Sequence, residues 1–102
     1  MNVQDKIKQQ VSENKIVLYM KGNAELPMCG FSSRAVSLLK SCGVPFATID
    51  VLQDENIRQG IKIFANWPTI PQLYVNGEFI GGSDIIAEMY ESGELQKLIK
   101  EV

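Results

Sequence analysis

The sequence predicts an α/β fold in which a four-stranded mixed sheet carries helices on both faces. A short apolar run at 16–20 is followed by a helical stripe and a second strand-like run at 46–51, the pattern of a parallel βαβ unit. Two later apolar runs are separated by Asn76-Gly77, the strongest short-range signal of a β-hairpin. A helical pattern follows this hairpin, so the second half of the chain is expected to be an antiparallel ββα unit.

The first half begins with a helix over 3–13, indicated by apolar residues at four-residue spacing: Val3, Ile7 and Val11. Residues 16–20 are all apolar, as in a strand buried on both faces. The next helix carries one apolar stripe, made of Ala35, Val36, Leu38, Leu39 and Cys42. Gly43 stands where a glycine commonly ends a helix, and Pro45 follows as a stop before the second strand at 46–51.

The second half begins with a helix over 54–65, indicated by Ile57, Ile61, Phe64 and Ala65. Residues 67–71 form a stiff, proline-rich segment before the hairpin strands at 73–75 and 79–80. Gly81-Gly82 breaks the chain, and Ser83 is the expected N-cap of the next helix. Leu95, Leu98 and Ile99 mark a last short helix. The resulting order of elements is that of a thioredoxin-like fold.

Length and composition favour one domain spanning residues 1–102. The chain is 45% hydrophobic and 22% charged, which are ordinary globular values. Its formal net charge of −2 disfavours a nucleic-acid binder that depends on phosphate contacts. The longest apolar runs are about five residues, against roughly 20 needed to cross a bilayer, and the polar first ten residues do not resemble a secretory leader. We therefore expect a cytoplasmic protein with no membrane or nucleic-acid partner.

The chain contains no histidine, which excludes several kinds of site. It cannot form a Ser-His or Cys-His catalytic pair, or a histidine-ligated zinc or haem site, from its own residues. Its two cysteines cannot complete a four-thiolate metal site. Any metal cluster or soft metal ion must therefore take ligands from outside the chain.

Cys29 is the candidate reactive residue, because it lies at the end of the first βα loop, directly before a helix. The free amides of a helix N-terminus favour an anion and lower the pKa of a cysteine, and Lys21 adds positive charge at the other end of the loop. The alternative is a small apolar residue that fills a gap. The tight turn made by Pro27, Met28, Gly30 and Ser32 does not resemble a core stripe and argues against that alternative.

Neither of the two residues that could resolve a mixed disulfide with Cys29 is suited to do so. Ser32 stands where a dithiol site places its second cysteine, and serine cannot perform that chemistry. Cys42 is 13 residues further along one predicted helix, roughly 20 Å away. A disulfide requires Cα atoms within about 7 Å, so Cys42 is interpreted as a buried core residue.

Four motifs together resemble the monothiol glutaredoxins of the Cys-Gly-Phe-Ser class. They are Lys21-Gly22, Pro27-x-Cys29-Gly30-Phe31-Ser32, Trp67-Pro68-Thr69-Ile70-Pro71-Gln72 and Gly81-Gly82-Ser83-Asp84. Each motif alone is weak, but all four occur in the family's order and spacing across nearly the whole chain. The resemblance is to the short single-domain form of the family, and it implies the glutaredoxin variant of the thioredoxin-like fold.

The resemblance implies a glutathione site, and the residues allow a physical account of its contacts. Lys21 and Arg58 match positions that hold the glycine carboxylate, where the arginine fork can bind two oxygens. Lys62 is a weaker candidate, and without the resemblance Arg58 would be interpreted as a solvated helix charge. Gly30 and Phe31, within the cysteine motif, belong to the same implied set.

The same resemblance implies contacts to the rest of glutathione. Pro71 matches the family's cis-proline, and a cis bond would present the Ile70 backbone to the cysteine part of the ligand. The alternative is a trans proline at a strand start. Ser83 and Asp84 match the site of the γ-glutamyl end, where helix amides bind its carboxylate and the Asp84 side chain accepts from its ammonium. The alternative role of Ser83 and Asp84 is N-capping of the helix. Trp67 and Pro68 are interpreted as structural residues that fix their loop.

Three functional hypotheses remain open. In the first, implied by the resemblance, a homodimer carries a [2Fe–2S] cluster held by two Cys29 thiolates and two glutathione thiolates, which completes the usual four ligands. The cluster would pass to apoproteins, and a BolA-like protein is a further possible partner. In the second, Cys29 acts as a glutathione-dependent thiol–disulfide oxidoreductase, and the resemblance implies that the long loop 21–28 makes this activity poor. The third is a thioredoxin-like adaptor without chemistry, which the implied glutathione contacts disfavour.

Overall fold

The computed structural model describes residues 2–102, and over this range the predicted order of helices and strands is confirmed. Met1, the first residue of the expected domain, lies outside the described residues. The elements are α1 (Val3–Glu13), β1 (Ile16–Met20), α2 (Gly30–Ser41), β2 (Ala47–Asp50), the 3-10 turn η1 (Val51–Gln53), α3 (Glu55–Ala65), β3 (Gln72–Val75), β4 (Glu78–Gly81), α4 (Ser83–Ser92) and α5 (Glu94–Lys100).

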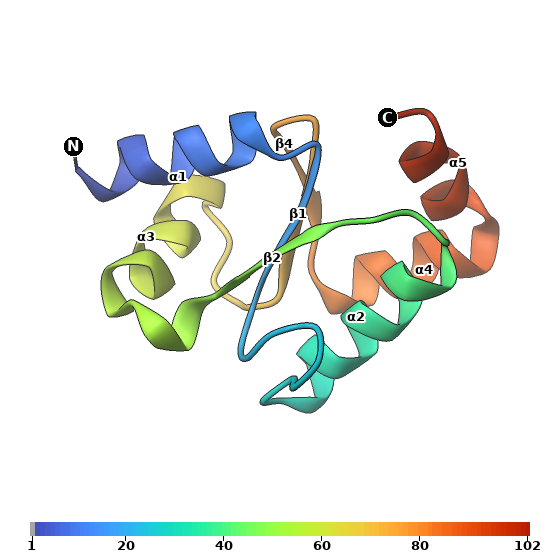
Figure 1. The fold of residues 1–102 in the computed structure, drawn as a ribbon, viewed down its shortest axis with the longest axis horizontal. Helices are drawn as coiled ribbons and strands as arrows, with labels where there is room; N and C mark the ends of the chain where they lie inside the picture. Colours follow the sequence, from blue (N-terminus) through green and yellow to red (C-terminus); the bar gives the residue numbers. More distant parts are fainter. Residues whose placement is uncertain (1) are drawn as a thin grey trace.

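The four strands form one mixed sheet in the order β2-β1-β3-β4. β1 runs parallel to β2 and antiparallel to β3, and β3 runs antiparallel to β4. Figure 1 shows α1 and α3 on one side of this sheet and α2, α4 and α5 on the other. At the hairpin turn Asn76 and Gly77 have φ of 52° and 81°, the left-handed conformation that the Asn-Gly pair predicts. The predicted thioredoxin-like sheet with helices on both faces is confirmed.

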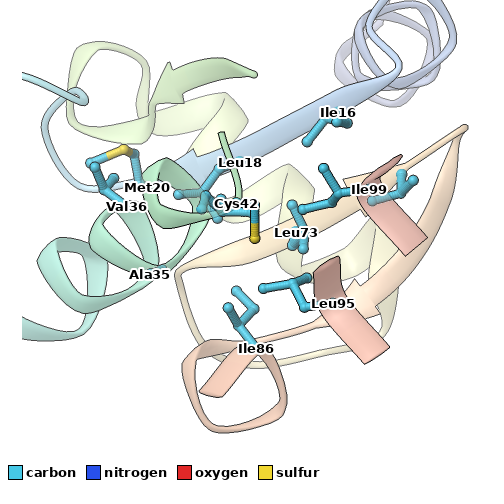
Figure 2. Close-up of a cluster of buried hydrophobic side chains, with 12 residues drawn as sticks. Ile16, Leu18, Met20, Ala35, Val36, Cys42, Leu73, Ile86, Leu95 and Ile99 are labelled. Carbon is cyan, nitrogen blue, oxygen red and sulfur yellow. The ribbon is translucent and has the colours of Figure 1, made fainter. Parts of the chain in front are cut away.

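The sheet separates two hydrophobic cores, because successive strand side chains point to opposite faces. Leu18 and Met20 of β1 pack with α2, α4 and α5, as Figure 2 shows for that side. Val17 and Tyr19 of the same strand pack with α1 and α3. Every residue of β1 is buried, as the continuous apolar run predicts.

Two local predictions were wrong. Ser83 does not cap α4: the N-cap is Gly82, and Ser83 is the first helical residue, whose hydroxyl has no hydrogen-bond partner among residues 2–102. The second strand is also shorter than predicted. The Asp50 side chain accepts from the Leu52 N–H and turns Val51 out of the strand into η1. Among the described residues, no helix is long and apolar enough to cross a membrane.

Candidate functional site

Cys29 is the N-cap of α2, where its extended backbone directs the sulfur toward the first turn of the helix. The Ser32 backbone N–H donates to the Cys29 Sγ over 3.3 Å. The Cys29 thiol and the Ser32 hydroxyl are also 3.3 Å apart and share a second hydrogen bond. The sequence-based placement of Cys29 at a helix start is therefore confirmed, and Ser32 contacts the sulfur directly.

These contacts change the pKa of the Cys29 thiol. Partial burial raises it, but hydrogen bonds from the Ser32 side chain and from the Ser32 and Phe31 amides lower it, and the charge of Lys21 lowers it further. The net effect is a pKa below the usual value for cysteine. A lowered pKa enriches the thiolate, which is the form that attacks a disulfide or binds a metal.

The loop between β1 and α2 is held beside the thiol by a short bridge between Gly22 and Pro27. The Met28 N–H donates to the Lys21 carbonyl over 2.8 Å, which closes the loop. The Lys21 N–H donates to the Ser32 Oγ, and the Gly22 N–H donates to the Asp50 carboxylate. The loop is thus attached both to the start of α2 and to the end of β2.

Large apolar side chains close to Cys29 in the sequence are exposed. Leu26, Met28 and Phe31 are 60–65% exposed, unusually high for large hydrophobic residues. Cys29 itself is only partly buried. Cys29 therefore belongs to a chain segment that exposes several apolar side chains.

A hollow of about 240 Å³ lies between α2, the 67–71 segment and the start of α4. Its lining brings together five of the predicted glutathione contacts: Phe31, Ile70, Pro71, Ser83 and Asp84. The Ile70–Pro71 peptide bond is cis, as expected. Ser83 and Asp84 are the first two residues of α4, so their amides are free of intrahelical partners. The Ser83 Oγ, buried and without a partner, adds an unused polar group to this end of the hollow.

A second hollow of about 180 Å³ adjoins the first, because Thr69 and Ile70 line both, and the two hollows are together called the groove. Its cations are Lys21, Arg58 and Lys62, and no carboxylate lines it. The buried Arg58 Nε has no hydrogen-bond partner, and the only carboxylate within salt-bridge distance of Arg58 is that of Glu55, at 3.9 Å, in the described chain. This end of the groove is suited to an anionic group.

Two predicted residues do not line these hollows. Gly30 is exposed, with no atom within 4 Å of an added Cβ, and Cys29 lines neither hollow, although Phe31, two residues further along, lines the first. Sequence reasoning missed two positive contributions. It treated Ser32 only as a missing cysteine, and it gave no role to Thr69, which lines both hollows. The position of Thr69 between Pro68 and the cis-proline is the signal that could have identified it.

Cys42 lies at the opposite end of α2, of which it is the C-cap. Its side chain is 7% exposed, and Figure 2 shows its sulfur among the apolar residues of the α2 side. Burial raises the pKa of the Cys42 thiol, against the attraction of Lys100. The prediction that Cys42 is a core residue is confirmed.

Fold and site together define a thioredoxin-like protein with one partly exposed cysteine of lowered pKa at the start of α2 and a cis-proline before β3. Residues 16–80 match the family model described as Glutaredoxin. Glutaredoxin 4 of Haemophilus influenzae (strain 86-028NP) is 58% identical over 102 residues, which are 100% of this chain and 95% of that protein. Glutaredoxin 4 of Escherichia coli (strain K12) is 57% identical over 97 residues, 95% of this chain and 84% of that protein. The chain belongs to the glutaredoxin family, as a monothiol member.

Solved structures agree with this assignment. Reduced apo GrxS14 of poplar has a TM-score of 0.84 and 45% identity, covering 97% of this chain and 91% of that one. The buckwheat glutaredoxin–glutathione complex has a TM-score of 0.85 and 26% identity, covering 97% of this chain and 88% of that one. Membership of the family implies glutathione as a ligand.

Proposed function

We propose that this protein binds glutathione along the two joined hollows, with the residues predicted from the sequence as its contacts. The cationic hollow suits the glycine carboxylate, with Arg58 as its main partner. The free amides of α4 suit the γ-glutamyl carboxylate, and the Ile70 backbone lies between these two ends. The similar buckwheat protein was solved as a glutathione complex, which supports the same ligand here.

The contact with Arg58 has a direct test. Arg58→Ala should weaken glutathione binding by about 1–3 kcal/mol, the range for a hydrogen bond to a charged group. Isothermal calorimetry with the reduced protein measures this change. The chain's other arginine, Arg34, is exposed on α2 and lines neither hollow, so Arg34→Ala is the matched control. Equal affinities in the two variants would contradict the assignment.

The function best supported is that of an iron–sulfur carrier, in which two copies of the chain share one [2Fe–2S] cluster. The observation that carries this proposal is one partly exposed thiol of lowered pKa, Cys29, with exposed apolar residues close to it in the sequence and Cys42 buried elsewhere. The described residues contain no group of three or more histidine, cysteine or acidic side chains that could hold a metal ion. Two Cys29 thiolates and two glutathione thiolates supply the four ligands that such a cluster usually takes.

Anaerobic reconstitution with iron, sulfide and glutathione tests the carrier. Visible absorption and solution mass should report a coloured dimer, and omission of glutathione should prevent it. Cys29→Ser should abolish the colour, because it removes the only ligand that each chain supplies. Cys42→Ser is the matched control and should retain the colour. A coloured Cys29→Ser protein would contradict the assignment of Cys29 as a cluster ligand.

A second function, glutathione-dependent thiol–disulfide exchange, is favoured by the lowered pKa of Cys29. The Cys29 thiolate would attack a protein–glutathione disulfide, forming a Cys29–glutathione disulfide and releasing the protein thiol. A second glutathione thiolate would then release Cys29 and leave as oxidised glutathione. A colourless monomer that removes glutathione from a glutathionylated peptide would favour this function over the carrier.

The proposed carrier delivers its cluster to apoproteins, and a BolA-like protein is a proposed alternative partner in place of the second copy. The exposed apolar residues around Cys29 are the surface that either partner would cover. The proposed location is the cytoplasm, a reducing compartment in which Cys29 and Cys42 both remain free thiols.

A further inference from the structure

A completely buried amide lies directly behind the groove. Gln72 is the first residue of β3 and is 0% exposed. Its Nε2 donates to the carbonyl oxygens of Trp67 and Thr69, each over 3.2 Å. Its Oε1 accepts from the Tyr74 hydroxyl over 3.0 Å. A buried polar group is costly unless it is hydrogen-bonded, and both donor hydrogens of this amide are used.

The segment between α3 and β3 has little other hydrogen bonding to hold it. The Trp67 N–H donates to the Lys62 carbonyl over 3.0 Å at the end of α3. In the described part of the chain, residues 68–71 make no backbone–backbone hydrogen bond outside regular elements. The Gln72 side chain therefore holds this segment in place of the backbone hydrogen bonds that fix a strand in a sheet.

The segment held in this way forms the shared wall of the groove. Thr69, whose carbonyl Gln72 binds, and the adjacent Ile70 line both hollows. Trp67, the other partner of Gln72, packs against Phe79 with ring centres 5.6 Å apart and lines the larger hollow. A displacement of this segment would change the position of the Ile70 backbone.

The Tyr74 hydroxyl sets the orientation of the Gln72 amide. Since the hydroxyl donates to Oε1, the NH₂ group is the end that faces the two carbonyls. Burial raises the pKa of Tyr74, so its hydroxyl remains protonated. The ring is fixed among three aromatic neighbours, Tyr19, Phe64 and Phe79, with centres 5.5–5.9 Å away.

We infer that Gln72, oriented by Tyr74, is a positioning residue of the glutathione site and holds the 67–70 segment where the Ile70 backbone can pair with the ligand. This role rests on the proposed function. Gln72 does not line either hollow and acts on the ligand only through the backbone of the segment.

Three single variants of nearly unchanged shape test the inference. Tyr74→Phe removes the orienting hydroxyl and should weaken glutathione binding about fivefold, the loss expected for one neutral hydrogen bond. Gln72→Glu replaces the donating NH₂ with an acceptor and should weaken binding about tenfold or more. The matched control is Tyr19→Phe, because Tyr19 is equally buried but donates to Gln10 on α1, over 2.7 Å. It should leave the affinity unchanged.

The measurements are calorimetric titration with glutathione, thermal unfolding, and acrylamide quenching of Trp67, the only tryptophan in the chain. Weaker binding and altered quenching in the Tyr74 and Gln72 variants, with neither change in Tyr19→Phe, would support the inference. Wild-type affinity in all three variants would overturn it and leave the proposed glutathione site standing. Equal losses of affinity in all three variants would also overturn the inference, because they would indicate a general loss of stability. If the wild-type protein itself bound no glutathione, the proposed function would fail, and the positioning role would fail with it.

Discussion

At the scale of the residue, Ser32 contributes more than the absence of a second thiol. Its side chain is 0% exposed, and its hydroxyl contacts both the Cys29 sulfur and the Lys21 N–H. One small buried side chain therefore stabilises the charge on the thiolate and attaches the neighbouring loop. A cysteine at this position would change both contacts as well as adding redox chemistry.

Ser32→Ala should raise the pKa of Cys29. The variant loses the side-chain hydrogen bond that favours the thiolate but keeps the amide hydrogen bonds. The pKa of Cys29 lies below its usual value in the wild type, so the thiolate forms at lower pH there than in the variant. The rate of iodoacetamide alkylation, measured against pH in Cys42→Ser protein, should therefore show its inflection at higher pH in Ser32→Ala.

The adjacent Ser33 provides the control for this experiment. It is exposed on α2, and only its backbone N–H contacts Cys29, through the carbonyl. Ser33→Ala should leave the alkylation profile at its wild-type position. An unchanged profile in Ser32→Ala as well would show that the helix amides and Lys21 alone determine the pKa.

Residue identity selected the candidate residues of the site, but it did not reveal the contacts that hold them in place. Cys29 could be selected from its position before a helix, whereas Arg58 and Ser83 were selected because they match positions of the family that the sequence resembles. The contacts of Ser32 with the loop and of Gln72 with the 67–70 segment join residues that only the fold brings together. Their hydrogen-bond partners are largely backbone groups, which no side-chain pattern in the sequence reveals.

At the scale of the element, the loop between β1 and α2 depends on the conformation of Gly22. Its φ is +88°, a region that residues with a side chain rarely adopt. A Cβ at this position would also meet the Leu26 carbonyl and lie 2.7 Å from the Met28 nitrogen. The loop that carries Lys21 to the thiol therefore requires glycine for two independent reasons.

Gly22→Ala should destabilise the protein by about 1–3 kcal/mol, the cost of a strained backbone conformation, and should displace Lys21 from Cys29. Guanidinium denaturation measures the first effect, and the alkylation profile of Cys29 measures the second. Gly30→Ala is the stability control, because Gly30 has an ordinary φ and no neighbouring atom within 4 Å of an added Cβ. If both variants unfolded at the wild-type denaturant concentration, the loop would have to accommodate the methyl group by rearranging.

Elements were predicted more reliably than their ends. The Asn76-Gly77 turn and the Gly43 stop were found because each needs a positive φ, which few residues adopt. The start of α4 was misplaced by one residue, because serine is a frequent N-cap and the two preceding glycines gave no contrary signal. The 3-10 turn after β2 depends on one hydrogen bond from the Leu52 N–H to Asp50, too local for a periodicity argument.

At the scale of the whole molecule, one sheet is shared by two cores, and the groove depends on both. Cys29 lies at the start of α2, which packs over the side of the sheet that carries Leu18. The cationic hollow is lined by residues of α3, which packs over the side of the sheet that carries Tyr19. β1 contributes alternate side chains to both cores, so loss of either core should weaken the strand that supports the other.

Leu18→Ala tests this coupling. Leu18 is 0% exposed in the α2-side core, and its truncation should cost about 2–5 kcal/mol, the range for a large buried aliphatic residue. Trp67 packs against Phe79, which belongs to the opposite core, and its fluorescence therefore reports unfolding of the α3 side. If the molecule unfolds as one unit, fluorescence and far-ultraviolet circular dichroism should shift together to lower denaturant concentration. The matched variant Ile61→Ala, in the α3-side core, should shift both signals in the same way. A Leu18→Ala protein in which Trp67 kept its wild-type transition would show that the two sides unfold separately, so that the halves of the proposed glutathione site could be lost independently.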